Sequence, residues 1–270
     1  MGASRVSRLE ARIREIRAGG RAAFIPYITA GDPSLDATVA LCGALGRAGA
    51  DVIEIGIPFS DPLADGPTIQ RSSERALAKG VALRDVIARL PAMRARAGVP
   101  LVLMTYLNPV MQYGIAPFAR AARRGGADGV IVTDMPVEES AEVLAACEAG
   151  GIDLITLAAP TSGDARLRKI ARAARGFIYC VTRAGVTGAR AELPRDLRAL
   201  VAKVRAASGK PVVVGFGIAT PEHVRAAARF ADGVVVGSAI VERIARHGRD
   251  RARMLAEVES FAGRLAAALG

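Results

Sequence analysis

Residues 52–57 read Val52-Ile53-Glu54-Ile55-Gly56-Ile57, a short apolar run that carries a single carboxylate. The run is nearly continuous in apolar character and does not alternate between apolar and polar residues. Strands that are covered on both faces have this pattern, and parallel sheets are covered on both faces. The run therefore indicates a strand of a parallel sheet.

Seven further runs of this kind lie along the chain, with longer helical patterns between them. Strand–helix alternation of this length predicts an α/β protein, a single eight-stranded parallel (β/α) TIM barrel that forms one domain over residues 1–270. The seven runs are Phe24–Ile28, Leu101–Met104, Val130–Val132, Leu154–Leu157, Phe177–Val181, Val212–Val214 and Val234–Val236.

Helical periodicity fills the segments between these runs. An extra helix is expected before Phe24 and a long C-terminal helix after Ser238. The region from Thr68 to Ala97 holds two helical stretches that separate near Gly80. Further helices are expected at Leu35–Ala48, Val137–Ala149, Ala165–Ala174 and Asp196–Ala207, and one that opens at Thr220-Pro221-Glu222.

A weak internal repeat supports the barrel. Gly49-Ala50-Asp51-Val52-Ile53 recurs as Gly126-Ala127-Asp128-Gly129-Val130-Ile131 and as Ala231-Asp232-Gly233-Val234-Val235. Each copy ends a helical pattern and starts a strand. Connections of this kind are also common by themselves, so the repeat is only supporting evidence.

The net charge of +11 raises the question of nucleic-acid binding. The arginines recur at helical spacing among Ala and Glu, as expected for solvated helix faces. The chain has four Tyr, seven Phe and no Trp, and it lacks interleaved basic and aromatic residues. We therefore expect no nucleic-acid partner.

Cys42, Cys147 and Cys180 are interpreted as reduced core residues, because their number is odd and none lies close to another in the sequence. The N-terminus lacks the apolar core of a signal peptide, and no segment approaches the length of a membrane span. A soluble cytoplasmic protein without a membrane partner is expected.

Two carboxylates are the main candidates for chemistry, because active sites of such barrels lie at the C-terminal ends of the strands. Glu54, inside an apolar run, is either a paired structural carboxylate or an acid whose pKa is raised by burial. The following loop, Pro58 to Thr68, carries Asp61 and Asp65. Asp61 precedes a proline and is a candidate turn residue. Asp65 is better placed to reach the barrel mouth, although each could be an ordinary turn aspartate.

Glycines follow the last strands of the predicted barrel. Gly215-Phe216-Gly217-Ile218 comes after the seventh strand and Gly237-Ser238-Ala239 after the eighth, which are the usual places of a phosphate site in this architecture. The alternative is tight turn packing. The segment from Thr182 to Ala189, after the sixth strand, is a candidate lid.

The positions of the lysines, histidines and glycines exclude several types of reaction. None of the four lysines lies late in a strand, so Schiff-base chemistry is not expected. His223 and His247 have no cysteine or carboxylate at ligand spacing, so we expect no metal. No dinucleotide fingerprint follows the first strand. Acid–base chemistry on a small phosphorylated substrate remains.

At these same residues the sequence resembles the tryptophan synthase alpha subunit family. The resemblance runs in order along nearly the whole chain. It is carried by residues 26–33, 54–67, 108–109, 134–136, 183–188 and 215–218, of which Glu54 to Pro67 is the longest and most specific segment.

The resemblance implies a lyase of tryptophan biosynthesis that cleaves indole-3-glycerol phosphate to indole and glyceraldehyde 3-phosphate by retro-aldol chemistry. Glu54 matches the acid–base residue of the family, and Asp65 matches the carboxylate that accepts the indole N–H. The positions that match substrate-binding residues are Tyr27, Tyr106, Tyr179, Thr187, Gly188, Phe216, Gly217, Gly237 and Ser238.

The resemblance also implies a partner, a beta subunit that contains pyridoxal phosphate and consumes indole, in an assembly of two alpha and two beta chains. No cofactor is expected in this chain. The segments that match partner-facing regions are Pro58 to Asp65, Asn108 and Asp134-Met135-Pro136.

Two other functions stay open on the sequence. One is another phosphate-binding barrel enzyme of the same pathway, such as an isomerase or the indole-glycerol phosphate synthase. The missing strand-end lysine argues against the synthase. The other is a non-catalytic activator of a beta subunit, against which the presence of both Glu54 and Asp65 argues.

Overall fold

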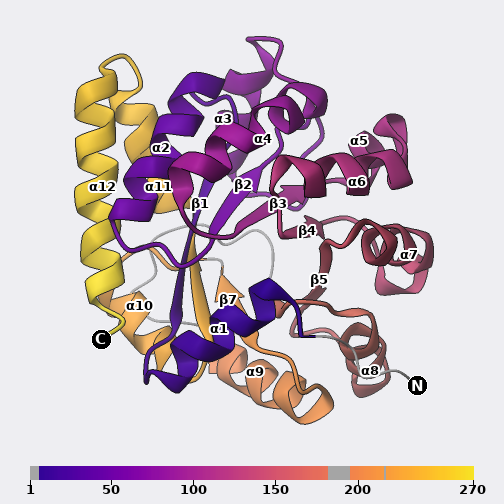
Figure 1. Ribbon diagram of the computed structural model, residues 1–270. Coiled ribbons are helices and arrows are strands. Elements are labelled where there is room, and N and C mark those ends of the chain that lie inside the picture. The colour runs from indigo at the N-terminus through magenta and orange to yellow at the C-terminus, as the bar shows by residue number, and fades with distance from the viewer. Residues whose placement is uncertain (1–5, 182–194, 216) are drawn as a thin grey trace.

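The computed structural model describes residues 6–181, 195–215 and 217–270 (Figure 1). Eight parallel strands follow one another in chain order and close into a barrel, with β1 paired to both β2 and β8. The strands are β1 (Ala23–Thr29), β2 (Ile53–Gly56), β3 (Leu101–Thr105), β4 (Gly129–Val132), β5 (Asp153–Ala158), β6 (Ile178–Val181), β7 (Val212–Gly215) and β8 (Gly233–Val236). The predicted fold class is confirmed.

Helices surround the barrel, as Figure 1 shows. They are α1 (Arg8–Ala18), α2 (Leu35–Arg47), α3 (Pro67–Leu77), α4 (Leu83–Ala97), α5 (Leu107–Tyr113), α6 (Ile115–Gly125), η1 (Val137–Glu139), α7 (Ala141–Gly150), α8 (Asp164–Ala173), α9 (Arg195–Ala207), α10 (Pro221–Ala228), α11 (Ser238–His247) and α12 (Arg251–Ala267).

The expected single long C-terminal helix is wrong. The structure has two helices, α11 and α12, with a break at residues 248–250. The Asp250 side chain accepts a hydrogen bond from the Arg253 backbone N–H at 3.0 Å and so caps a new helix. The helical segment expected between β3 and β4 forms two helices, α5 and α6, and the extra N-terminal helix is present as α1.

Alternate residues of each strand face the barrel interior, and the rest face the helices. The interior forms a separate apolar cluster, which includes Ile25 and Tyr27 of β1 and Val102 and Met104 of β3. Helix α1 closes the N-terminal end of this interior with Leu9, Ile13 and Ile16, all buried.

The repeated aspartates have a common structural role. Asp51 donates its backbone N–H to the Phe24 carbonyl at 2.9 Å and accepts the Phe24 N–H on its carboxylate at 2.9 Å. Asp128 makes the same two bonds to Leu101, and Asp232 makes them to Val212. Each aspartate therefore fixes the register of two neighbouring strands where they begin.

Helix α1 attaches to these three aspartates through arginines. Arg12 lies 3.4 Å from Asp51, Arg17 lies 3.5 Å from Asp232, and Arg8 lies 3.8 Å from Asp128. This part of the basic surface is thus not only a solvated helix face. These arginines hold α1 over the N-terminal end of the barrel.

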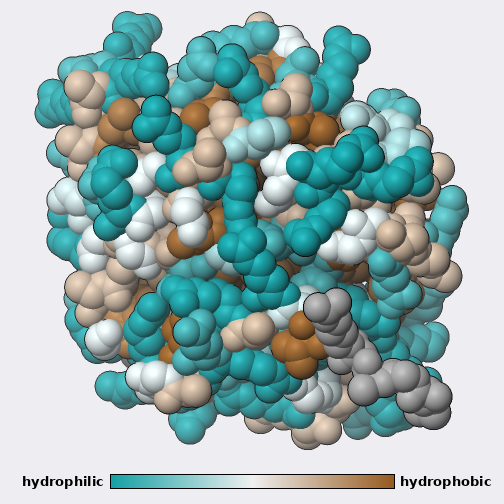
Figure 2. All heavy atoms as spheres, viewed as in Figure 1, coloured by the Kyte–Doolittle hydropathy of each residue, from teal (hydrophilic) through white to brown (hydrophobic). Residues whose placement is uncertain are grey.

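Figure 2 shows hydrophilic residues over much of the face seen in Figure 1, with apolar residues in small patches.

We predict that Gly56→Ala destabilises the barrel. A Cβ at Gly56 would lie 2.0 Å from the hydroxyl of Tyr27, a buried side chain that has little room to move. Overpacking of this kind lowers the free energy of unfolding by about 1–3 kcal/mol, which urea denaturation measures. The control is Gly263→Ala in α12, where a Cβ meets nothing within 4 Å, so we expect unchanged or slightly higher stability. Equal stability of the Gly56 variant and the wild type would contradict the packing argument.

Candidate active site

Glu54 lies on β2 and faces the barrel interior. Its side chain is buried, with 1% exposure, and lines a cavity at the C-terminal ends of the strands. The Oε2 atom has no hydrogen-bond partner among the described residues. Burial, and then the charge of Asp65, raise the pKa of Glu54 from 4.5 to about 8. A carboxyl group in this environment holds its proton at neutral pH.

Asp65 lies on the loop between β2 and α3 and lines the same cavity. The Tyr106 hydroxyl donates to its Oδ2 at 2.9 Å, and the Gln70 side chain donates to its carbonyl at 2.9 Å. Burial raises the pKa of Asp65 to about 6, while the bond from Tyr106 acts in the opposite direction. Asp65 is therefore ionised in a pH range in which Glu54 is protonated.

The structure separates Asp61 from Asp65. Asp61 is exposed, accepts a hydrogen bond from Ser60 at 2.6 Å, and is not among the residues that line the cavity. This arrangement fits the turn role that its position before Pro62 suggests.

Tyr27 of β1 and Tyr179 of β6 border the cavity. Gly56 and Gly215 leave room for the two hydroxyls, since a Cβ at either glycine would lie within 2.1 Å of one of them. Burial, first of all, raises the pKa of both tyrosines, and the nearby carboxylates raise it further. Both rings therefore stay neutral beside the carboxylates.

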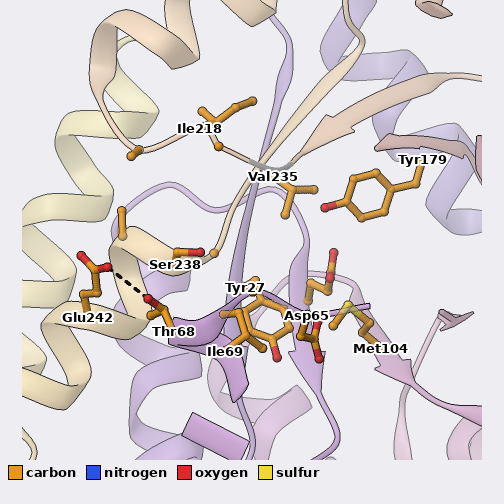
Figure 3. A pocket seen from close by; sticks show the side chains of 16 residues that line it. Tyr27, Asp65, Thr68, Ile69, Met104, Tyr179, Ile218, Val235, Ser238 and Glu242 are labelled. Atoms are coloured by element: carbon orange, nitrogen blue, oxygen red, sulfur yellow. Dashed lines mark hydrogen bonds between the residues drawn. The ribbon is translucent and has the colours of Figure 1, made fainter. Parts of the chain in front are cut away.

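Gly217, Gly237 and Ser238 line the cavity. Ser238, which Figure 3 labels, is the first residue of α11. Gly217 has a φ of +76°, and a Cβ there would meet nothing within 4 Å. Gly237 precedes α11 and provides no side-chain cap. Backbone N–H groups in the first turn of a helix favour an anion, so this end of the cavity suits a phosphate group.

The other predicted site residues are not among those that line the cavity in the described part of the chain. Tyr106 contacts Asp65 but is not among the cavity-lining residues; it stacks on Phe59 with ring centroids 5.0 Å apart. Thr187, Gly188 and Phe216 lie outside the described residues.

Several residues that line the cavity were not predicted from the sequence. Thr68 and Glu242 form a hydrogen bond at its edge, and an apolar wall comes from different strands and helices. Glu242 follows Ser238 by four residues on one helix face, a spacing that points to the same site. The apolar wall includes Ile69, Met104, Ile218 and Val235.

Within residues 6–181, 195–215 and 217–270, no group of three or more His, Cys, Asp or Glu side chains is arranged to hold a metal ion. None of the helices in this part of the chain has the length and apolar character needed to cross a membrane. The three cysteines are free and buried.

A closed parallel barrel with a buried and a half-buried carboxylate in one cavity at the C-terminal ends of its strands places the protein among the (β/α)8-barrel enzymes. Comparisons with known proteins identify its family. The model of the family "Tryptophan synthase alpha chain" matches residues 13–269. The chain therefore belongs to the tryptophan synthase alpha chain family, which cleaves indole-3-glycerol phosphate to indole in tryptophan biosynthesis.

Individual relatives agree. The tryptophan synthase alpha chain of Geobacter sulfurreducens is 48% identical over 265 residues, which cover 98% of this chain and 100% of the relative. The structure of Mycobacterium tuberculosis tryptophan synthase contains a chain with a TM-score of 0.89 and 41% identity, and 98% of each chain is covered. The Legionella pneumophila alpha chain has a TM-score of 0.88 and 37% identity, with 98% of this chain and 97% of that chain covered.

We predict that Glu54→Gln stabilises the fold more at high pH than at low pH. The folded-state pKa is raised from 4.5 to about 8, so the wild type loses stability as the pH rises between these values. Glutamine cannot ionise and avoids this loss, which is on the order of 3–5 kcal/mol above pH 8. Thermal unfolding at pH 5 and pH 9 tests this. Glu148→Gln, at an exposed carboxylate of α7, is the control. A gain for Glu54→Gln that is the same at both pH values would argue against a buried, protonated Glu54.

Proposed function

We propose that this chain cleaves indole-3-glycerol phosphate to indole and glyceraldehyde 3-phosphate with Glu54 as the acid–base residue and Asp65 as its electrostatic partner. The observation that carries the proposal is the separation of the two pKa values, about 8 for Glu54 and about 6 for Asp65, in one cavity. Two carboxyl groups whose environments separate their pKa values take the roles of proton donor and fixed negative charge.

The reaction needs both roles. Glu54 donates its proton to the indole ring carbon that carries the glyceryl chain, and the ring nitrogen becomes positive. Ionised Asp65 accepts the N–H hydrogen bond and stabilises that charge. When the carbon–carbon bond breaks, its electron pair returns to the ring, and the hydroxyl next to the bond becomes an aldehyde. The hydroxyl proton passes to Glu54, so the enzyme returns to its starting state.

We infer that each part of this substrate has its own place in the cavity. We assign the indole ring to the wall made by Tyr27, Met104 and Tyr179, and the phosphate to Gly217, Gly237 and Ser238 at the start of α11. In this proposal Gly188 and Phe216 complete the phosphate site, Thr187 belongs to the lid, and Tyr106 holds Asp65.

We predict that Glu54→Gln and Asp65→Asn each lower indole release at least 100-fold, the usual size of an acid–base contribution. Release from indole-glycerol phosphate is measured with and without a beta subunit, and Glu148→Gln is the matched control. If the chain only activated its partner, the Glu54→Gln variant would perform as well as the wild type when mixed with a beta subunit. No release by the wild type even with the partner would reject the substrate.

We also propose that the chain assembles with a beta subunit that carries pyridoxal phosphate, as two alpha and two beta chains in the cytoplasm, and that it holds no cofactor itself. Among the described residues, Leu63 and Met111 are large apolar side chains with 89% and 60% exposure. Leu63 lies in the Pro58–Asp65 segment, and Met111 follows Asn108 on α5. Exposed apolar side chains of this size are typical of docking surfaces.

Asp134 connects the third expected partner region to this surface, since its carboxylate accepts the Leu107 N–H at 2.7 Å. A partner that docks on these segments would contact the loop that carries Asp65.

We predict that Leu63→Glu weakens stimulation of indole release by the beta subunit at least tenfold and leaves the rate of the isolated chain within about twofold, because it buries a charge in the interface. Val6→Glu, at another exposed apolar side chain (56% exposure) next to α1, is the control. Titration of the variant chains with beta subunit measures the effect. Equal stimulation of both variants would exclude Leu63 from the interface.

A further inference from the structure

Helix α3 connects the Asp65 loop to the helix that begins at the proposed phosphate site. Thr68, three residues after Asp65, lies in the first turn of α3. Its hydroxyl donates to Oε1 of Glu242 on α11 at 3.2 Å. In Figure 3 this bond lies on the Ser238 side of the cavity, away from Asp65. The bond thus joins two elements that carry different parts of the site.

The Thr68 hydroxyl acts both as donor and as acceptor. It donates its single hydrogen to the Glu242 carboxylate and accepts a hydrogen bond from Arg71 at 3.4 Å. Gly66, which precedes α3, offers no side-chain cap. Within the described part of the chain, no other side-chain hydrogen bond connects α3 to α11.

The beginning of α3 is joined to the Asp65 backbone by a hydrogen bond. Gln70 of α3 donates to the Asp65 carbonyl at 2.9 Å, and Pro67 restricts the backbone between them. On its buried side α3 is joined to β1 by a hydrogen bond between the hydroxyl of Ser72 on α3 and that of Thr29 on β1, whose oxygens lie 2.6 Å apart. Helix α3 is thus joined to the Asp65 backbone, to β1 and, through Thr68, to α11.

We propose that Thr68 and Glu242 are positioning residues that hold the Asp65 segment at a fixed place relative to α11. They act through the placement of Asp65 and not by direct contact with the reacting atoms. The inference deepens the proposed function and rests on the role of Asp65 in it.

The test compares variants that remove the bond with variants that keep it. Thr68→Val removes the hydroxyl at nearly constant shape, whereas Thr68→Ser retains it. Glu242→Leu and Glu242→Gln both remove the charge, but only glutamine keeps an oxygen that accepts the bond. Thr161→Val, at an exposed threonine between β5 and α8, is the control.

Two readouts are measured on the full chain: the titration of the Asp65 carboxyl by ¹³C NMR, without substrate, and kcat and KM for indole release with a beta subunit. We expect Thr68→Val and Glu242→Leu to titrate Asp65 at higher pH, because Asp65 loses part of the hydrogen bond from Tyr106. We expect kcat to fall about fivefold with KM for Thr68→Val within twofold. We expect Thr68→Ser to show the Asp65 titration and the kcat of the wild type. We expect Glu242→Gln to have a higher kcat than Glu242→Leu.

The double variant Thr68→Val/Glu242→Leu should be no worse than the poorer single variant, since both substitutions remove one interaction. Asp65 titration that is the same in Thr68→Val, Glu242→Leu and the wild type would overturn the inference. A displaced titration together with a wild type that releases no indole would support the positioning role while rejecting the proposed reaction. Melting temperatures of all variants separate these outcomes from loss of folding.

Discussion

The double hydrogen bond between an aspartate at the start of one strand and the backbone of the strand before it determines the geometry of this barrel. A one-residue slip between strands would turn every side chain to the opposite face. Asp51, Asp128 and Asp232 prevent this slip for three strand pairs, because each binds both the N–H and the carbonyl of a single residue. The same carboxylates bind the arginines of α1. Strand register and closure of the barrel end thus depend on one set of groups.

Correct register places Glu54 inside the barrel, where its carboxyl group works against stability. The buried Oε2 atom has no partner in the described part of the chain, and the charged form of the group is disfavoured. A structural carboxylate at this depth would be paired, as Asp51 is with Arg21 at 2.6 Å. An acid that faces a cavity with one oxygen free of hydrogen-bond partners among the described residues is instead suited to hold a proton that the substrate then receives. The surrounding barrel supplies the stability that this arrangement costs.

The sequence predicted the eight strands because each is a short apolar run that is buried on both sides, and this property is local. It predicted Glu54 because a carboxylate in such a run is unusual. It did not predict the division between α11 and α12, which depends on a cap by Asp250, nor the division of the helical segment between β3 and β4 into α5 and α6. The contact of Thr68 with Glu242 joins residues 174 positions apart, and only the closure of the barrel brings them together.

The closed ring also explains why one cavity can combine such different chemistry. β2 and the loop after it supply the carboxylates, and α11, which follows β8, supplies the free helix N-terminus. These segments are far apart in sequence, yet they lie beside each other because β1 pairs with both β2 and β8. Helix α3 packs against β1 and α11 in the same region. A ligand that spans the cavity therefore touches elements from both ends of the chain, and its binding depends on the contacts that join those ends.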